Sequence, residues 1–159
     1  MQFVSNLIER VEKTVSVIFM FAMAVIIIAG VLFRYFLNAP IFWAGEVSIY
    51  LMIWISFLGG SLGLKNKSQA AVLILVERLP KELQKILNIV IHILMLGFLL
   101  ILIYYSFQWL LSSNVAFQKS TALRMPMWIA YIAVPTGLTF SFVHLTSNLI
   151  GIVQGGEAE

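Results

Sequence analysis

Four long runs without a charged residue constrain this chain more than any other feature. They cover residues 15–33, 47–64, 86–111 and 125–152. A helix needs about 20 mostly apolar residues to cross about 30 Å of hydrocarbon. None of the runs alternates with the period of a barrel strand, and in lipid a helix satisfies its own backbone groups. We therefore predict an all-α membrane protein with four transmembrane helices.

The predicted spans cover about residues 14–36, 44–64, 85–111 and 125–152 of one membrane domain, residues 1–159. The composition excludes an ordinary soluble protein, since 61% of residues are hydrophobic, 11% are charged and the mean hydropathy is +0.99. A net charge of +3 spread over such a chain does not indicate nucleic-acid binding. The absence of cysteine excludes disulfides and thiolate chemistry.

The basic residues predict the orientation of the four spans. Seven lysines and arginines fall in the N-terminal segment and the second loop, against three in the first and third loops. Because basic loops stay on the cytoplasmic side, both termini are expected in the cytoplasm.

The second loop contains seven consecutive apolar residues, 70–76, followed by a mixture of charged and apolar ones. This run is too short to cross a membrane, so we predict an interfacial amphipathic segment over about residues 68–82. Pro80 is expected to start a new helical segment. The alternative is a loop that only dips its apolar side into the interface. The candidate anchors to anionic lipid are Lys65, Lys67, Arg78, Lys81 and Lys85.

Polar side chains within the spans are candidates for a functional or packing role. Asn88 and His92 share one face of the third helix, and His144 and Asn148 share one face of the fourth. The two histidines lie at similar predicted depths, so a bis-histidine haem site in a helical bundle is one alternative. The other is hydrogen bonding between helices or to a partner subunit.

Small residues close the second span in the sequence "SFLGGSLG". Ser56, Gly59, Gly60 and Gly63 let another backbone approach closely, although the sequence does not identify the helix that packs there. On the fourth span, Pro126 and Pro135 are expected to mark a helix start and a kink.

The turn "FRYFLNAPIFWAGE", residues 33–46, places one charge at the end of the first span and another at the start of the second. A contact between Arg34 and Glu46 would hold the two helices together, and the alternative is two independently solvated ends. Neither reading makes them catalytic. The chain shows no nucleophile with a base in a plausible site, no phosphate loop and no metal cluster, so we expect neither an enzyme nor a cofactor. A small autonomous multidrug exporter is a further alternative, but Glu46 is its only candidate acid.

Several of these features together resemble the small membrane subunit of tripartite ATP-independent periplasmic (TRAP) transporters. They are Arg34-Tyr35 with Asn38, Trp43 and Glu46, "FLGGSLGL", "ERLP" and "STALRMPMWIAYIAVPTG". The family usually has a histidine and an aspartate after the second span, where this chain has Lys67-Ser68-Gln69. Any role that depends on those two residues is therefore in doubt here.

The resemblance implies a place in the bacterial inner membrane and two partners. One is a large multi-span subunit that carries substrate and sodium, which this chain would scaffold. The other is a periplasmic substrate-binding protein, which the outer turns would help to dock. The implied substrate is an organic acid, with sialic acid favoured over C4-dicarboxylates. The candidate interface or docking residues are Arg34, Tyr35, Asn38, Trp43, Glu46, Ser56, Gly59, Gly60, Gly63, Asn88, His92, Lys119, Arg124 and His144.

Overall fold

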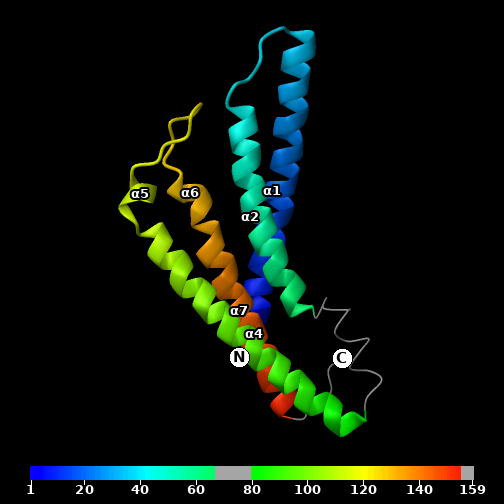
Figure 1. Ribbon diagram of the computed structural model, residues 1–159. Helices are drawn as coiled ribbons and strands as arrows, with labels where there is room; N and C mark the ends of the chain where they lie inside the picture. The colour runs from blue at the N-terminus through cyan, green and yellow to red at the C-terminus, as the bar shows by residue number, and fades with distance from the viewer. Residues whose placement is uncertain (67–79, 155–159) are drawn as a thin grey trace.

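Four long helices make up most of the computed structural model, which describes residues 1–66 and 80–154 (Figure 1). They are α1 (Gln2–Phe36), α2 (Ala44–Lys65), α4 (Lys81–Leu110) and α7 (Ala133–Val153). Two short helices, α5 (Ser113–Ala116) and α6 (Trp128–Tyr131), lie between α4 and α7. Four stretches of the described chain are helical, long and apolar enough to cross a membrane: Gln2–Phe36, Ala44–Lys65, Leu83–Leu110 and Trp128–Val153. The predicted all-α class with four spans is confirmed at this level.

Helix α1 starts well ahead of its uncharged run. Its 35 residues correspond to a length of about 52 Å, compared with about 30 Å for the hydrocarbon layer. The first three turns, which carry Ser5, Glu9 and Glu12, therefore extend the helix beyond the predicted span.

The second loop lies mostly outside the described residues, so the predicted interfacial segment over 68–82 is not tested. At its end, Pro80 directly precedes α4, as its sequence position predicted. The fourth apolar stretch is divided at Ile132, between α6 and α7. Pro135 explains this break, because it has no N–H to bond to the carbonyl of Tyr131 four residues earlier.

The long helices pack as a row. Helix α1 packs along α2, α2 along α7, and α7 along α4, with only a small direct contact between α1 and α7. In Figure 1 the α1–α2 hairpin and the α4–α7 pair meet low in the view and splay apart toward the opposite end. In the most apolar part of each stretch, the buried share of the residues is 39% for Trp128–Val153. It is 6% for Gln2–Phe36, 11% for Ala44–Lys65 and 6% for Leu83–Leu110. The fourth stretch is therefore the centre of the row.

Small residues on α7 allow this central position. Ala133, Gly137 and Ser141 recur every fourth residue and are all buried. A Cβ added at Gly137 would lie 2.8 Å from both the Cβ and the carbonyl oxygen of Phe57 on α2. The absence of a side chain at Gly137 therefore lets α7 approach the backbone of α2 closely.

Candidate functional site

Glu46 lies in the first turn of α2 and binds the loop that precedes α6. Its carboxylate accepts hydrogen bonds from the Ser120 hydroxyl, from the Ala122 N–H at 2.8 Å and from the Leu123 N–H at 3.1 Å. Among the ion pairs of residues 1–66 and 80–154, none joins Glu46 to Arg34. The Arg34–Glu46 contact, one of the two alternatives for this turn, is not made, because backbone N–H groups from a loop distant in the sequence bind the carboxylate instead.

That loop is a short hairpin, residues 118–127. Its strands are joined by the Ser120 N–H donating to the Met125 carbonyl at 2.8 Å and the Met127 N–H donating to the Gln118 carbonyl at 3.1 Å. Arg124 has a φ of 52°, which turns the chain back at the tip. Lys119 and Arg124 are both exposed. The Glu46 carboxylate thus fixes a turn that presents two cations.

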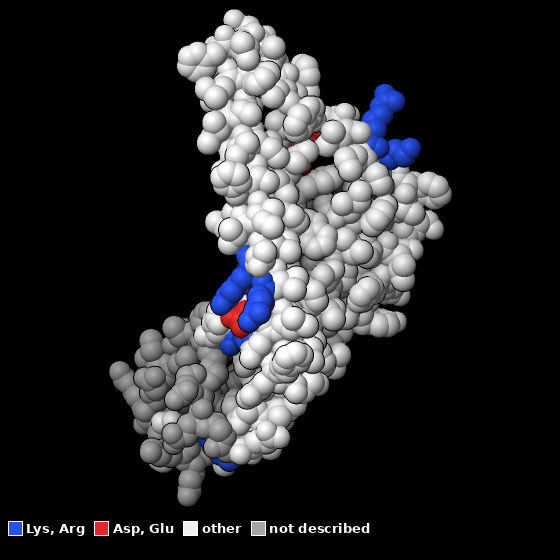
Figure 2. All heavy atoms as spheres, turned by 180° about the vertical axis from the view of Figure 1, so that it is seen from behind, with Lys and Arg blue, Asp and Glu red and all other residues white. Residues whose placement is uncertain are grey.

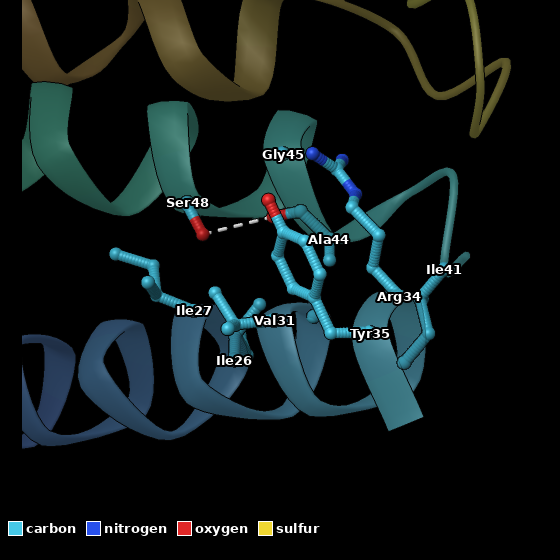
Figure 3. Close-up of a pocket in the computed structure, with 10 residues that line it drawn as sticks. Ile26, Ile27, Val31, Arg34, Tyr35, Ile41, Ala44, Gly45 and Ser48 are labelled. Atoms are coloured by element: carbon cyan, nitrogen blue, oxygen red, sulfur yellow. Dashed lines mark hydrogen bonds between the residues drawn. The ribbon is translucent and has the colours of Figure 1, made fainter. Parts of the chain in front are cut away.

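Arg34 and Tyr35 line a groove of about 280 Å³ between the end of α1 and the start of α2. Figure 3 shows both side chains extending from α1 toward the first turn of α2, with the Arg34 guanidinium near Gly45. Asn38 follows with a φ of 48°, a left-handed conformation that asparagine adopts more readily than most residues. The next backbone N–H, from Ala39, bonds to the Phe33 carbonyl at 3.1 Å and closes the turn. The Arg-Tyr-x-x-Asn pattern therefore ends α1 and begins the turn.

Trp43 stands immediately before α2, and its side chain is 45% exposed. Its carbonyl accepts from the Val47 N–H at 3.1 Å, which starts the helix. The structure therefore places Trp43 at the end of the span, where tryptophan is common at membrane surfaces.

Three of the small residues of α2, namely Ser56, Gly59 and Gly60, face away from the rest of the described chain. A Cβ added at Gly59 or Gly60 would meet nothing within 4 Å, and Ser56 is exposed with its hydroxyl bonded to the Met52 carbonyl of its own helix. Gly63 is half-buried near the end of the helix. The face formed by Ser56, Gly59 and Gly60 is therefore free to pack against a helix from elsewhere.

His144 is fully buried on α7 and uses both ring nitrogens. Nδ1 lies 2.7 Å from the Ser5 hydroxyl, and Nε2 lies 2.9 Å from Oε2 of Glu12. The exposed fractions are 0% for His144, 1% for Glu12 and 2% for Ser5. Both partners belong to α1, so this trio is the direct link between α1 and α7.

The trio has the residue types of a Ser–His–carboxylate hydrolase site, which the sequence analysis did not anticipate. Such a site needs a serine oxygen that a substrate can reach. Ser5 is buried together with the imidazole and the carboxylate, so substrate has no access. The sequence contained one signal, since Ser5 and Glu12 are seven residues apart and lie on the same face of a helix.

His92 does not pair with His144. Its Nδ1 lies 2.8 Å from the carbonyl of Asn88, one turn earlier on α4, and both residues are half-buried. Because both nitrogens of His144 already have partners, ligation of a haem iron would first have to break the bond to Ser5 or to Glu12. The geometry gives no support to the bis-histidine alternative.

Of the five proposed lipid anchors, Lys65 has a different environment from the one expected. Its ammonium group lies 2.5 Å from Glu9 and 2.7 Å from the Asn6 side-chain oxygen, so it ties α2 to α1. Lys67 and Arg78 lie outside the described residues, as does the side chain of Lys81, while Lys85 is exposed.

Glu9 precedes the uncharged run of α1 and bridges Lys65 and Lys13, the latter at 2.6 Å. The two ammonium groups lower the pKa of Glu9 to about 2, because they stabilise its charged form. Figure 2 shows basic side chains around an acidic one in a hollow of this face. The ends of α1 and α2 are therefore joined by an ion-pair cluster.

Comparison with known proteins identifies the family. The family described as "Tripartite ATP-independent periplasmic transporters, DctQ component" matches residues 23–155. The C4-dicarboxylate TRAP transporter small permease protein DctQ of Vibrio cholerae is 25% identical, over 98% of this chain and 80% of that protein. The sialic acid TRAP transporter small permease protein SiaQ of Vibrio cholerae is 23% identical, over 94% of this chain and 85% of that protein.

A longer relative is also similar. The isethionate TRAP transporter permease protein DctMQ of Oleidesulfovibrio alaskensis is 30% identical over 90% of this chain, which spans 24% of that protein's length. These findings agree with the four apolar helices and with the resemblance in the turn between the first two spans. The chain belongs to the DctQ family of small permease subunits of TRAP transporters, and is therefore a multi-pass membrane component of a transporter and not an enzyme.

Proposed function

We propose that this chain is the stationary scaffold of a TRAP transporter in a bacterial inner membrane, with both termini in the cytoplasm. It would hold a large subunit that carries substrate and sodium. The observation that carries the proposal is the row of helices, because a row leaves apolar surface on both sides.

Polar contacts join the helices near both of their ends, as expected for a part of the transporter that does not move. Glu46 fixes the 118–127 hairpin, while the Ser5–His144–Glu12 trio and the Lys65–Glu9 pair fix the other end of α1. Any movement of α1, α2, α7 and the hairpin relative to one another would have to break these contacts in each transport cycle. Buried hydrogen-bonded groups are expensive to separate, which favours a rigid role.

The partner subunit has support from the longer relative. The name of that relative, DctMQ, joins the letter Q of the DctQ component to a second letter, M, and this chain matches only 24% of its length. We infer that the remaining length of such a protein corresponds to the large subunit that this chain binds as a separate polypeptide. The Ser56–Gly59–Gly60 face of α2 is the proposed contact, since small residues allow close helix packing in membranes.

The outer turns are proposed to dock the periplasmic substrate-binding protein. Lys119 and Arg124 project from a hairpin that Glu46 holds in place, and Arg34 lies near the adjacent turn. Figure 2 shows basic side chains projecting from this end of the molecule. Such a basic surface would attract an acidic surface of the partner and raise the rate of encounter.

The substrate is proposed to be a small organic acid. The relatives' names include isethionate, C4-dicarboxylates, ectoine and sialic acid, all at 30% identity or less. These names do not single out sialic acid. We propose that selectivity is set by the partner proteins, because relatives of this chain that are named for different substrates all match it at similarly low identity.

Co-purification tests the scaffold role. The full chain is expressed with the large subunit and binding protein encoded beside it, and the complex is isolated in mild detergent. We expect a stable complex with the large subunit that weakens in Gly59→Leu, while Gly151→Leu, a matched change near the end of α7, keeps it. Recovery of this chain alone, folded and stable beside a folded large subunit, would contradict the proposal.

A further inference from the structure

Four buried side-chain oxygens within residues 1–66 and 80–154 have no hydrogen-bond partner. They are Oε1 of Glu12 and the hydroxyl oxygens of Ser16, Tyr50 and Ser61. Buried polar groups in proteins nearly always have a partner, either protein or ordered water. Three of these four oxygens, those of Glu12, Ser16 and Ser61, come from neighbouring turns of α1 and α2.

The contacts between α1 and α2 place Ser61 opposite Glu12. The helices run antiparallel, with Lys65 bonded to Glu9 and the ring of Trp54 6.2 Å from that of Phe19. One turn back from Lys65 on α2 is Ser61, and about one turn forward from Glu9 on α1 is Glu12. Ser16 follows Glu12 by four residues and therefore lies on the same face of α1.

The contacts between α2 and α7 place His144 at the same level. These helices run parallel, with the side-chain nitrogen of Asn148 3.3 Å from the Lys65 carbonyl. Moving back four residues on both helices leads from that contact to Ser61 and His144. Since His144 is bonded to Oε2 of Glu12, the unpartnered Oε1 belongs to the same three-helix junction.

Ser16 and Ser61 also differ from other hydroxyl residues of the helices. Most of those donate to the carbonyl four residues earlier in their own helix: Thr14, Ser48, Ser56, Thr136, Thr139, Ser141 and Thr146. Ser16 and Ser61 make no such bond, although both hydroxyl oxygens are buried. Their protons therefore need an acceptor that lies between helices.

We propose that Glu12, Ser16 and Ser61 bind one internal water molecule at the junction of α1, α2 and α7. The water would accept a hydrogen bond from each serine hydroxyl and donate a hydrogen bond to Oε1 of Glu12. None of these three oxygens is hydrogen-bonded to another, and a water molecule between them would give each of them a partner. A metal cation fits less well, because it would leave both hydroxyl protons without an acceptor.

The test uses the full, isotope-labelled chain in lipid nanodiscs. Nuclear Overhauser transfer from water is measured at the protons of Ser16 and Ser61, together with the melting temperature. We expect long-lived water contacts at both residues. Ser61→Ala and Ser16→Ala should each weaken the water signal at the other serine and lower the melting temperature.

Ser141→Ala is the matched control, since this buried hydroxyl bonds within its own helix, and it should keep the water signal. Absence of the water contacts in the unmodified chain would overturn the proposal, even if the alanine variants do not fold. A melting temperature that rises in Ser61→Ala would also overturn it. So would a melting temperature that falls when sodium is replaced by choline at constant ionic strength, which would indicate a cation.

Discussion

Oε2 of Glu12 lies 2.9 Å from Nε2 of His144, which joins residues 132 positions apart in the chain. Both side chains are at most 1% exposed, and the other imidazole nitrogen is bonded to Ser5. Helix α1 otherwise contacts α7 very little. This pair therefore fixes how the N-terminal turns of α1 lie against the central helix.

His144→Ala is expected to destabilise the chain strongly. Removing one partner of a buried pair leaves the other without compensation, which typically costs about 3–5 kcal/mol. The measurement is the free energy of unfolding in detergent. Glu12→Gln should cost less than Glu12→Ala, because the amide oxygen can still accept from Nε2.

The matched control is His92→Ala, which removes a half-buried imidazole bonded to the backbone of its own helix. It should change the free energy of unfolding much less. Equal losses in His92→Ala and His144→Ala would show that the trio has no special role in stability.

Gly137→Ala is expected to separate α7 from α2. The new Cβ would lie 2.8 Å from the Phe57 carbonyl oxygen, and backbone cannot move aside as a side chain can. Forcing extra volume into a packed site costs about 1–3 kcal/mol. Gly60→Ala should leave the free energy of unfolding of the isolated chain nearly unchanged, since nothing lies within 4 Å. Similar losses in both variants would contradict this packing.

The sequence predicted the four apolar helices and the break near Pro135 because these depend on local properties. Uncharged runs of sufficient length form helices in lipid, and proline cannot donate the backbone bond that a continuous helix needs. Neither inference requires knowing which helices are neighbours. For the same reason, both histidines could be assigned to their helices from sequence, whereas their partners could not.

The hydrogen-bond partners of these side chains could not be predicted from sequence, because they depend on which helices are neighbours in the row. Glu12 precedes the uncharged run and looks like a solvated charge until α7 is placed beside it. Gly137 and Gly59 are equally small, and only the packing shows that Gly137 is the one in close contact within this chain. The spacing of Ala133, Gly137 and Ser141 was the sequence signal for the packed face.

The stabilising effect of Glu9 should disappear in acid. Its pKa is about 2 in the folded chain, below the ordinary value of 4.5, so folding favours the ionised carboxylate. That stabilisation is fully present above about pH 4.5 and decreases as the pH falls toward 2. Melting temperatures should therefore converge in acid for the unmodified chain and Glu9→Gln, and differ at pH 6. A constant difference from pH 6 to pH 2 would rule out the ion-pair account.

Glu46→Ala is expected to release the 118–127 hairpin, because the Ala122 and Leu123 N–H groups and the Ser120 hydroxyl lose their acceptor. Hydrogen bonds to an ionised carboxylate are stronger than those between neutral groups. Hydrogen exchange of the hairpin amides should rise by orders of magnitude in Glu46→Ala and less in Glu46→Gln. Arg34→Ala should leave that exchange unchanged, since Arg34 lines the neighbouring groove without pairing with Glu46. Faster exchange of the hairpin amides in Arg34→Ala than in Glu46→Ala would contradict this prediction. It would instead support the Arg34–Glu46 contact that the sequence suggested.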